Sequence, residues 1–334
     1  MLQHSIRAAL HLPFLIKRIR GYIGIQKQFI NNYVEPVLKQ AMLKNDGSLD
    51  EDDLKKITGY YGLAVPAILG ESFCALRGFP MTEKERGAST CQGAITGLFD
   101  DFFDKDFLEE EIIKDRINEQ AATSVKKSNE KLFEIFYNEA LQNVPRREQM
   151  KNKLIDVYHA QVDSLEQKEF INKERLLAIT LYKGGASLQF YRSAFEHPLA
   201  PGEDELMYKA GGIMQLANDV FDVYKDREAQ IKTLVTTATK IKDVRVLFSK
   251  LLSAFYIEST SLPYPHRNIR IFLDILSIGI FNRCYVCLDQ LEKNEMHTGN
   301  TFQVDKYSRK QLICDMDTKK NMLRSAAYFL RSTN

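Results

Sequence analysis

The sequence is poor in residues that break helices and has no tryptophan. Its 334 residues include only 9 prolines and 17 glycines. It also lacks an uninterrupted apolar run of about 20 residues, the length that a transmembrane helix needs, so we expect no membrane span. The 5 cysteines are scattered, odd in number and too sparse for a disulfide framework, which favours a reducing cytoplasm.

Charge is balanced over the chain. Lys and Arg number 46 against 44 Asp and Glu, which leaves a formal net charge of +2. No global field therefore indicates a nucleic-acid partner, and any functional charge must be local. With 44% hydrophobic and 27% charged residues, the composition is typical of a globular protein with a substantial core.

Apolar residues repeat at helical spacing between the few breakers, and no stretch alternates as a strand does. Thr82 followed by Glu85, and Ser48 followed by Glu51, fit capping boxes at helix starts. We predict an all-α protein, a single domain over 1–334, with about a dozen helices around a central cavity. The predicted helices cover 5–20, 24–43, 50–76, 83–104, 108–119, 125–142, 147–169, 173–195, 203–226, 236–258, 266–292 and 306–330.

Two segments leave alternatives open. The first 25 residues mix Leu, Ile and Phe with basic side chains, namely His4, Arg7, Lys17, Arg18 and Arg20. This stretch fits a transit peptide, a helix in peripheral contact with a membrane, or an ordinary amphipathic first helix, and the lack of a small-residue cleavage site favours the last. Cys284 and Cys287 have the spacing of a redox or zinc pair, but no second pair lies nearby, which disfavours a metal.

The first of two acidic clusters ends a predicted helix. Asp100, Asp101 and Asp104 stand in an apolar stretch, and Asp100 and Asp104 are one helical turn apart. The i, i+4 spacing places their carboxylates on the same helix face.

The second cluster repeats oxygen ligands over three turns. Asn218, Asp222 and Asp226 occupy positions i, i+4 and i+8, and Asp219 stands beside them. Two opposed acidic faces would repel each other unless cations lay between them. Hard divalent ions such as Mg²⁺ suit such oxygen ligands, with phosphate groups completing the coordination. Together the two clusters predict a diphosphate-binding protein.

Polar companions surround the second cluster in the sequence. Gln215 lies about one turn before it, and Tyr182-Lys183-Gly184-Gly185 lies upstream. Two successive glycines inside a helix cost about 1 kcal/mol each relative to alanine. We therefore expect a kink or a close ligand approach at Gly184, with Lys183 meeting the diphosphate.

These motifs resemble those of class I isoprenoid synthases. Asp100–Asp104 is similar to the family's first DDxxD motif, and 211–222 to its GxxxQxxDDxxD motif with Asn218 in place of an aspartate. Lys183-Gly184 stands where prenyl synthases have Lys-Thr, and Gln161 with Asp163 resembles the family's glutamine-and-aspartate helix. The resemblance covers roughly residues 90–240, in the family's order.

The departures from the family pattern narrow the activity. Chain-elongating members have an arginine pair after the first aspartates, which holds a second diphosphate, whereas here Asp104 is followed by Lys105 and Asp106. The resemblance thus implies a terpene synthase that ionises one prenyl diphosphate. A condensing synthase of the prenyl diphosphate or squalene-phytoene type, and a non-catalytic subunit that binds prenyl diphosphate, remain the alternatives.

The resemblance also assigns roles to residues. It implies two Mg²⁺ ions on the first cluster and a third on the second, with the metal ligands among Asp100, Asp101, Asp104, Asn218, Asp219, Asp222 and Asp226. The implied diphosphate ligands are Lys183, Lys232, Arg175 and Gln215. The implied pocket residues are Phe99, Phe103, Gln161, Asp163, Tyr182, Gly184 and Phe190, because aromatic ring faces stabilise a carbocation. We expect a monomer or a homodimer.

Overall fold

The computed structural model describes residues 2–104, 109–119, 126–169 and 171–332, and their side chains except at 2–10, 104 and 332. Every regular element among these residues is a helix, which confirms the all-α prediction. The chain divides into two compact units. The α6 unit comprises Lys17–Gln161 and Gln189–Leu199, and the α11 unit comprises Met1–Ile16, Val162–Leu188 and Ala200–Asn334.

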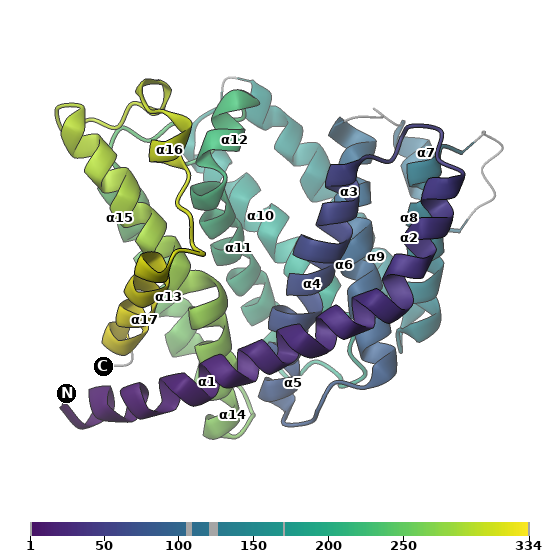
Figure 1. Ribbon diagram of the computed structural model, residues 1–334, viewed down its shortest axis with the longest axis horizontal. Helices are drawn as coiled ribbons and strands as arrows, with labels where there is room; N and C mark the ends of the chain where they lie inside the picture. Colours follow the sequence, from purple (N-terminus) through teal and green to yellow (C-terminus); the bar gives the residue numbers. More distant parts are fainter. Residues whose placement is uncertain (1, 105–108, 120–125, 170, 333–334) are drawn as a thin grey trace. The chain divides into compact units, whose positions relative to one another are not determined.

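Helices of the α6 unit surround its longest member, α6 (Figure 1). In chain order they are the second part of α1 (Leu2–Phe29), η1 (Ile30–Val34), α2 (Glu35–Leu43), α3 (Glu51–Lys55), η2 (Lys56–Tyr60), α4 (Tyr61–Ala64), η3 (Val65–Gly70), α5 (Glu71–Arg77), α6 (Glu83–Asp104), α7 (Glu110–Ile117), α8 (Ser128–Asn143), most of α9 (Arg147–Ser164) and the end of α10 (Lys173–Arg192).

The core of the α6 unit is aromatic. Helices α6 and α8 run side by side (Figure 1). The ring centroid of Phe133 lies 5.9 Å from that of Phe99, 5.1 Å from Phe102 and 5.5 Å from Tyr137. These four side chains are at most 3% exposed. Burial of each large apolar side chain stabilises the fold by about 1.5–3 kcal/mol, so this cluster fixes α6 against α8.

The helix starts of this unit test both capping predictions. Thr82 Oγ1 accepts the Glu85 amide at 3.2 Å, and the Glu85 carboxylate accepts the Thr82 amide at 2.9 Å, so the first capping box is confirmed. The second prediction is wrong, because the box forms between Asp50 and Asp53 instead of at Ser48. The helix predicted over 50–76 is also interrupted, since the wider π-helical turns η2 and η3 alternate with α3, α4 and α5.

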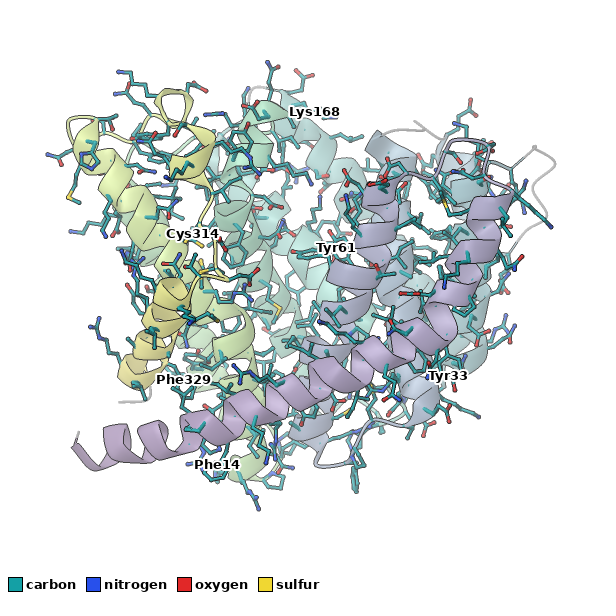
Figure 2. All side chains as sticks on the ribbon, viewed as in Figure 1. Phe14, Tyr33, Tyr61, Lys168, Cys314 and Phe329 are labelled. Carbon is teal, nitrogen blue, oxygen red and sulfur yellow. The ribbon has the colours of Figure 1, made fainter. Side chains whose placement is uncertain are left out.

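The α11 unit contains the remaining helices. They are the first part of α1, η4 (Leu165–Lys168), most of α10, α11 (Glu203–Phe221), α12 (Val223–Glu228), α13 (Ile241–Ser259), α14 (His266–Leu276), η5 (Ser277–Phe281), α15 (Asn282–His297), η6 (Val304–Lys306), α16 (Arg309–Leu312) and α17 (Lys319–Ser332). Helix α17 packs on α15, where the rings of Tyr328 and Tyr285 stack at 5.1 Å. Phe329 of α17, labelled in Figure 2, is buried.

The single helix predicted over 306–330 is wrong. Helices α16 and α17 are separated by a turn that contains Cys314 (Figure 2). The Asp315 side chain accepts the Asp317 amide at 2.9 Å, and Thr318 Oγ1 accepts the Asn321 amide at 3.3 Å. Short polar side chains that bind nearby backbone in this way compete with helix continuation and favour a new helix start.

Among the described residues, one helical run is long and apolar enough to cross a membrane by length and composition. It covers His266–His297, and 61% of its most apolar window is buried inside the protein. The core helix of a globular unit meets the same criterion, so this run is weak evidence for a span.

Candidate functional site

The first acidic cluster is anchored by a glutamine from a neighbouring helix. Asp100 is half-buried near the end of α6, and Gln161 Nε2 on α9 donates a hydrogen bond to its Oδ1 at 2.6 Å. Both residues belong to the α6 unit. The structure thus joins Gln161, an implied pocket residue, to the first acidic cluster. Asp104 is the last residue of α6, and its side chain lies outside the described ones.

Asp101 lies in a different environment from Asp100. Its side chain is 2% exposed, and its Oδ1 lies 3.2 Å from Lys56 Nζ on η2. The same ammonium lies 3.7 Å from Asp53 Oδ1. Successive helix positions differ by about 100°, so Asp101 points away from the Asp100 face. A buried ion pair with Lys56 thus engages this carboxylate, and its metal role stays a prediction.

Helix α6 carries a row of polar residues that ends at Asp100 and that was not predicted from the sequence. Gln92, Thr96 and Asp100 are spaced i, i+4 and i+8. Gln92 Nε2 donates to the Phe190 carbonyl at 2.8 Å, and the Thr96 and Tyr191 hydroxyls lie 2.9 Å apart. Burial raises the pKa of Tyr191 above its ordinary value, and the nearby Asp100 adds to that rise. The i, i+4, i+8 spacing of these polar residues is the sequence signal from which the row could have been predicted.

The phenylalanines predicted to line a pocket belong to the core of the α6 unit. Phe99 and Phe103 are 2% and 9% exposed, and their ring centroids lie 5.5 Å apart. Phe190 is 2% exposed and packs beside Tyr191 at 5.8 Å. Neighbouring protein rings pack against them, and their role as carbocation liners stays a prediction.

The second cluster keeps its one-turn spacing across a helix break. Helix α11 ends at Phe221 and α12 begins at Val223. The Asp222 amide nevertheless donates to the Asn218 carbonyl at 2.8 Å, and the Asp226 amide donates to the Asp222 carbonyl at 2.9 Å. Asn218 Nδ2 also donates to Asp222 Oδ2 at 3.2 Å. We call these three half-buried residues, Asn218, Asp222 and Asp226, the acidic ladder.

The electrostatics of the acidic ladder fit a cation. Burial raises the pKa of Asp222 above its ordinary value. Burial and repulsion from Asp219 and Asp222 raise the pKa of Asp226 to about 7. A divalent ion would relieve both costs, and carboxylate with amide oxygens is the donor set that Mg²⁺ prefers. Among the described residues, no group of three or more His, Cys, Asp or Glu side chains is arranged to hold a metal. The ladder itself offers two carboxylates and one amide.

Asp219 is set apart from the ladder by its hydrogen bonds. It is 4% exposed, and Gln215 Nε2 donates to its Oδ1 at 3.0 Å while Thr180 Oγ1 donates to its Oδ2 at 3.2 Å. Burial raises its pKa to about 6 against the opposing effects of these bonds and of the Lys183 charge. The two side chains thus bind each other, and the roles of Asp219 as a metal ligand and of Gln215 as a diphosphate ligand stay predictions.

The double glycine does not kink its helix. Helix α10 runs without interruption through Gly184 and Gly185. A Cβ atom on Gly184 would lie 2.0 Å from the Gly211 carbonyl oxygen of α11, and one on Gly185 would lie 2.4 Å from the Tyr208 ring. The predicted kink is absent, since α10 continues through both glycines, and Gly184 lets the backbones of α10 and α11 touch. The pocket role of Gly184 stays a prediction.

Lys183 is the predicted diphosphate ligand that the α11 unit places best. It is half-buried on α10, and its charge lowers the pKa of both Asp219 and Asp226. Its backbone carbonyl accepts the Ser187 hydroxyl at 2.7 Å. The neighbouring Tyr182 is also half-buried. Lys183 thus brings a positive charge next to the acidic ladder.

Two other predicted diphosphate ligands have protein partners. Arg175 donates to Glu166 at 2.9 and 2.5 Å and lies 3.2 Å from Asp163 Oδ2. Lys232 Nζ donates to the Glu169 carbonyl at 2.7 Å. These contacts tie the end of α9 and the segment after it to α10 and to the segment after α12. The predicted site roles of Arg175, Asp163 and Lys232 stay predictions.

Comparisons with known proteins add little. A scan against protein-family models finds no match, and neither does a search of curated proteins. Among solved structures, the chain is similar to one reported as the crystal structure of a dehydrosqualene synthase in complex with ligand. The identity is 11% and the TM-score 0.43, over 95% of this chain and 99% of that chain. A likeness this distant carries no conclusion about activity.

Proposed function

We propose that the chain is a class I terpene synthase, which ionises one prenyl diphosphate of C15 to C25 with Mg²⁺ and releases inorganic diphosphate. The observation that carries the proposal is the acidic ladder, in which Asn218, Asp222 and Asp226 occupy successive turns at half-buried positions. Carboxylates in this setting are costly without a counter-charge, which a divalent cation would supply.

Each acidic cluster has a defined part in this proposal. Asn218, Asp222 and Asp226 would hold one ion, and Asp100 would hold others, with Gln161 fixing its orientation. When bound, Mg²⁺ supplies positive charge for the departing diphosphate. Lys183 adds a fixed positive charge beside the ladder, and a preorganised charge stabilises the anion without reorganisation. The half-buried Tyr182, next to Lys183, is our candidate for an aromatic face toward the carbocation.

Two alternatives are separated from this proposal by one assay. The protein is incubated with geranyl, farnesyl, geranylgeranyl and C25 prenyl diphosphates and Mg²⁺, with and without isopentenyl diphosphate, and products are identified by gas chromatography–mass spectrometry. We expect a hydrocarbon or alcohol with the carbon number of the substrate, unchanged by isopentenyl diphosphate. Products of added carbon number would establish a condensing synthase, and tight binding without product would establish a binding subunit. Cytoplasmic location, a monomer or homodimer, and peripheral membrane contact stay predictions from the sequence.

A further inference from the structure

Helices α10 and α11 cross in an antiparallel register that the glycines define. A Cβ on Gly184 would lie 2.7 Å from Gln215 Cβ, and one on Gly211 would lie 2.8 Å from Leu188 Cβ. One step farther along the same register, Thr180 meets Asp219. Contact through backbone atoms at Gly184 and Gly211 therefore brings Thr180, one turn from Gly184, within hydrogen-bond distance of Asp219, two turns from Gly211.

The contact between Thr180 and Asp219 is a buried bond between helices. Thr180 is 2% exposed and Asp219 is 4% exposed, and the bond length is 3.2 Å. A threonine inside a helix often binds the carbonyl one turn back on its own helix. Here its hydroxyl binds a carboxylate of the neighbouring helix, and Gln215 holds the other oxygen of that carboxylate. Asp219 is thereby fixed in one orientation.

This bond lies close in sequence to both Lys183 on α10 and the acidic ladder. On α10, Lys183 follows Thr180 by one turn, and on α11, Asp219 is the chain neighbour of Asn218 in the acidic ladder. The position of the lysine relative to the ladder thus depends on how the two helices are registered at Thr180.

We propose that Thr180 is a positioning residue: through Asp219 it sets Lys183 against the acidic ladder, so that ammonium and metal ions meet the same diphosphate group. The inference rests on the proposed function. Thr180 itself touches neither metal nor substrate in this assignment, and its effect is exerted through Asp219 and Lys183.

The test compares Thr180→Val, which keeps the shape and removes the hydroxyl, with Thr180→Ser, which keeps the hydroxyl. Affinity for inorganic diphosphate in Mg²⁺ is measured by isothermal titration calorimetry on the full chain. Loss of a hydrogen bond to a charged group changes an affinity that depends on it by roughly 10-fold or more. We expect about that loss for Thr180→Val and recovery to within about 3-fold for Thr180→Ser. Ser259→Ala is the matched control, because Ser259 is fully buried and donates only to the Phe255 carbonyl of its own helix.

A double-mutant cycle distinguishes positioning from general stability. If Thr180 acts through Lys183, Thr180→Val should have almost no further effect on diphosphate affinity in a Lys183→Met background. Additive losses, or equal losses for Thr180→Val and Ser259→Ala, would overturn the inference and leave the proposed function intact. Wild-type protein that binds no diphosphate in Mg²⁺ would overturn the proposed function, and the inference with it.

Discussion

Substitution of alanine for Gly184 tests the helix crossing quantitatively. The new Cβ would lie 2.0 Å from the Gly211 carbonyl oxygen, whereas ordinary contact begins at 3.4 Å, so the shortfall is 3.4 − 2.0 = 1.4 Å. Both contacting groups are backbone, and no side-chain rotation relieves the clash. Overpacking of a well-packed site costs about 1–3 kcal/mol, and the upper end applies here because two helices must separate. The better helix propensity of alanine returns about 1 kcal/mol.

The net loss for Gly184→Ala is therefore about 2 kcal/mol, which lowers the melting temperature by roughly 3 °C, because the unfolding entropy is about 2.1 cal/mol/K per residue over 334 residues. Gly24→Ala is the control, because Gly24 also lies inside a helix but has no atom within 4 Å of its would-be Cβ. That change should stabilise by about 0.5–1 kcal/mol. Thermal unfolding followed by far-UV circular dichroism measures both. A Gly184→Ala protein that melts at or above the wild-type temperature would refute the backbone contact between α10 and α11.

Three further predictions concern the site and the core. Asn218→Ala or Asp222→Ala should abolish Mg²⁺-dependent turnover and leave the circular dichroism spectrum unchanged, because the proposed function assigns these half-buried side chains to Mg²⁺ binding. Retained turnover would remove the ladder from the mechanism. Burial raises the pKa of Asp226 to about 7, so the folded state takes up a proton that the unfolded chain binds only near its ordinary pKa. The metal-free protein should then gain stability as the pH falls from about 8 to 5, and Asp226→Asn should flatten that profile in chemical unfolding; an unchanged profile would contradict the shift. Phe102→Ala should cost about 3–5 kcal/mol in urea unfolding, because Phe102 is fully buried against Phe99 and Phe133, and a loss below about 1 kcal/mol would argue against a packed core there.

The helical framework was predictable where local signals determine it. Helix α6 begins and ends at the predicted residues. Its start is set by the capping box of Thr82 and Glu85. The acidic ladder was predictable for the same reason, since i, i+4 spacing in one segment suffices to stack its members. Local reasoning failed at Gly184, because a kink, a ligand approach and a helix crossing all require the same missing side chain. Only the position of Gly211 on the partner helix distinguishes them.

The contacts that the sequence does not reveal are those between different segments of the chain. Asp101 is an implied metal ligand, and the structure pairs it with Lys56 on η2. Phe99 is an implied pocket residue, and the ring of Phe133 on α8 packs against it. Arg175 is an implied diphosphate ligand, and Glu166 pairs with it. Spacing within one segment carries no information about such contacts.

The proposed function is tested most directly by the stoichiometry of diphosphate release. A single prenyl diphosphate is supplied with Mg²⁺ and no isopentenyl diphosphate, and inorganic diphosphate and residual substrate are measured over time with wild-type protein and with Asp222→Ala. We expect one inorganic diphosphate per substrate consumed with the wild-type protein, and no release with Asp222→Ala or with a chelator present. No release from any substrate of C10 to C25, or equal release by the two proteins, would contradict metal-dependent ionisation at the acidic ladder.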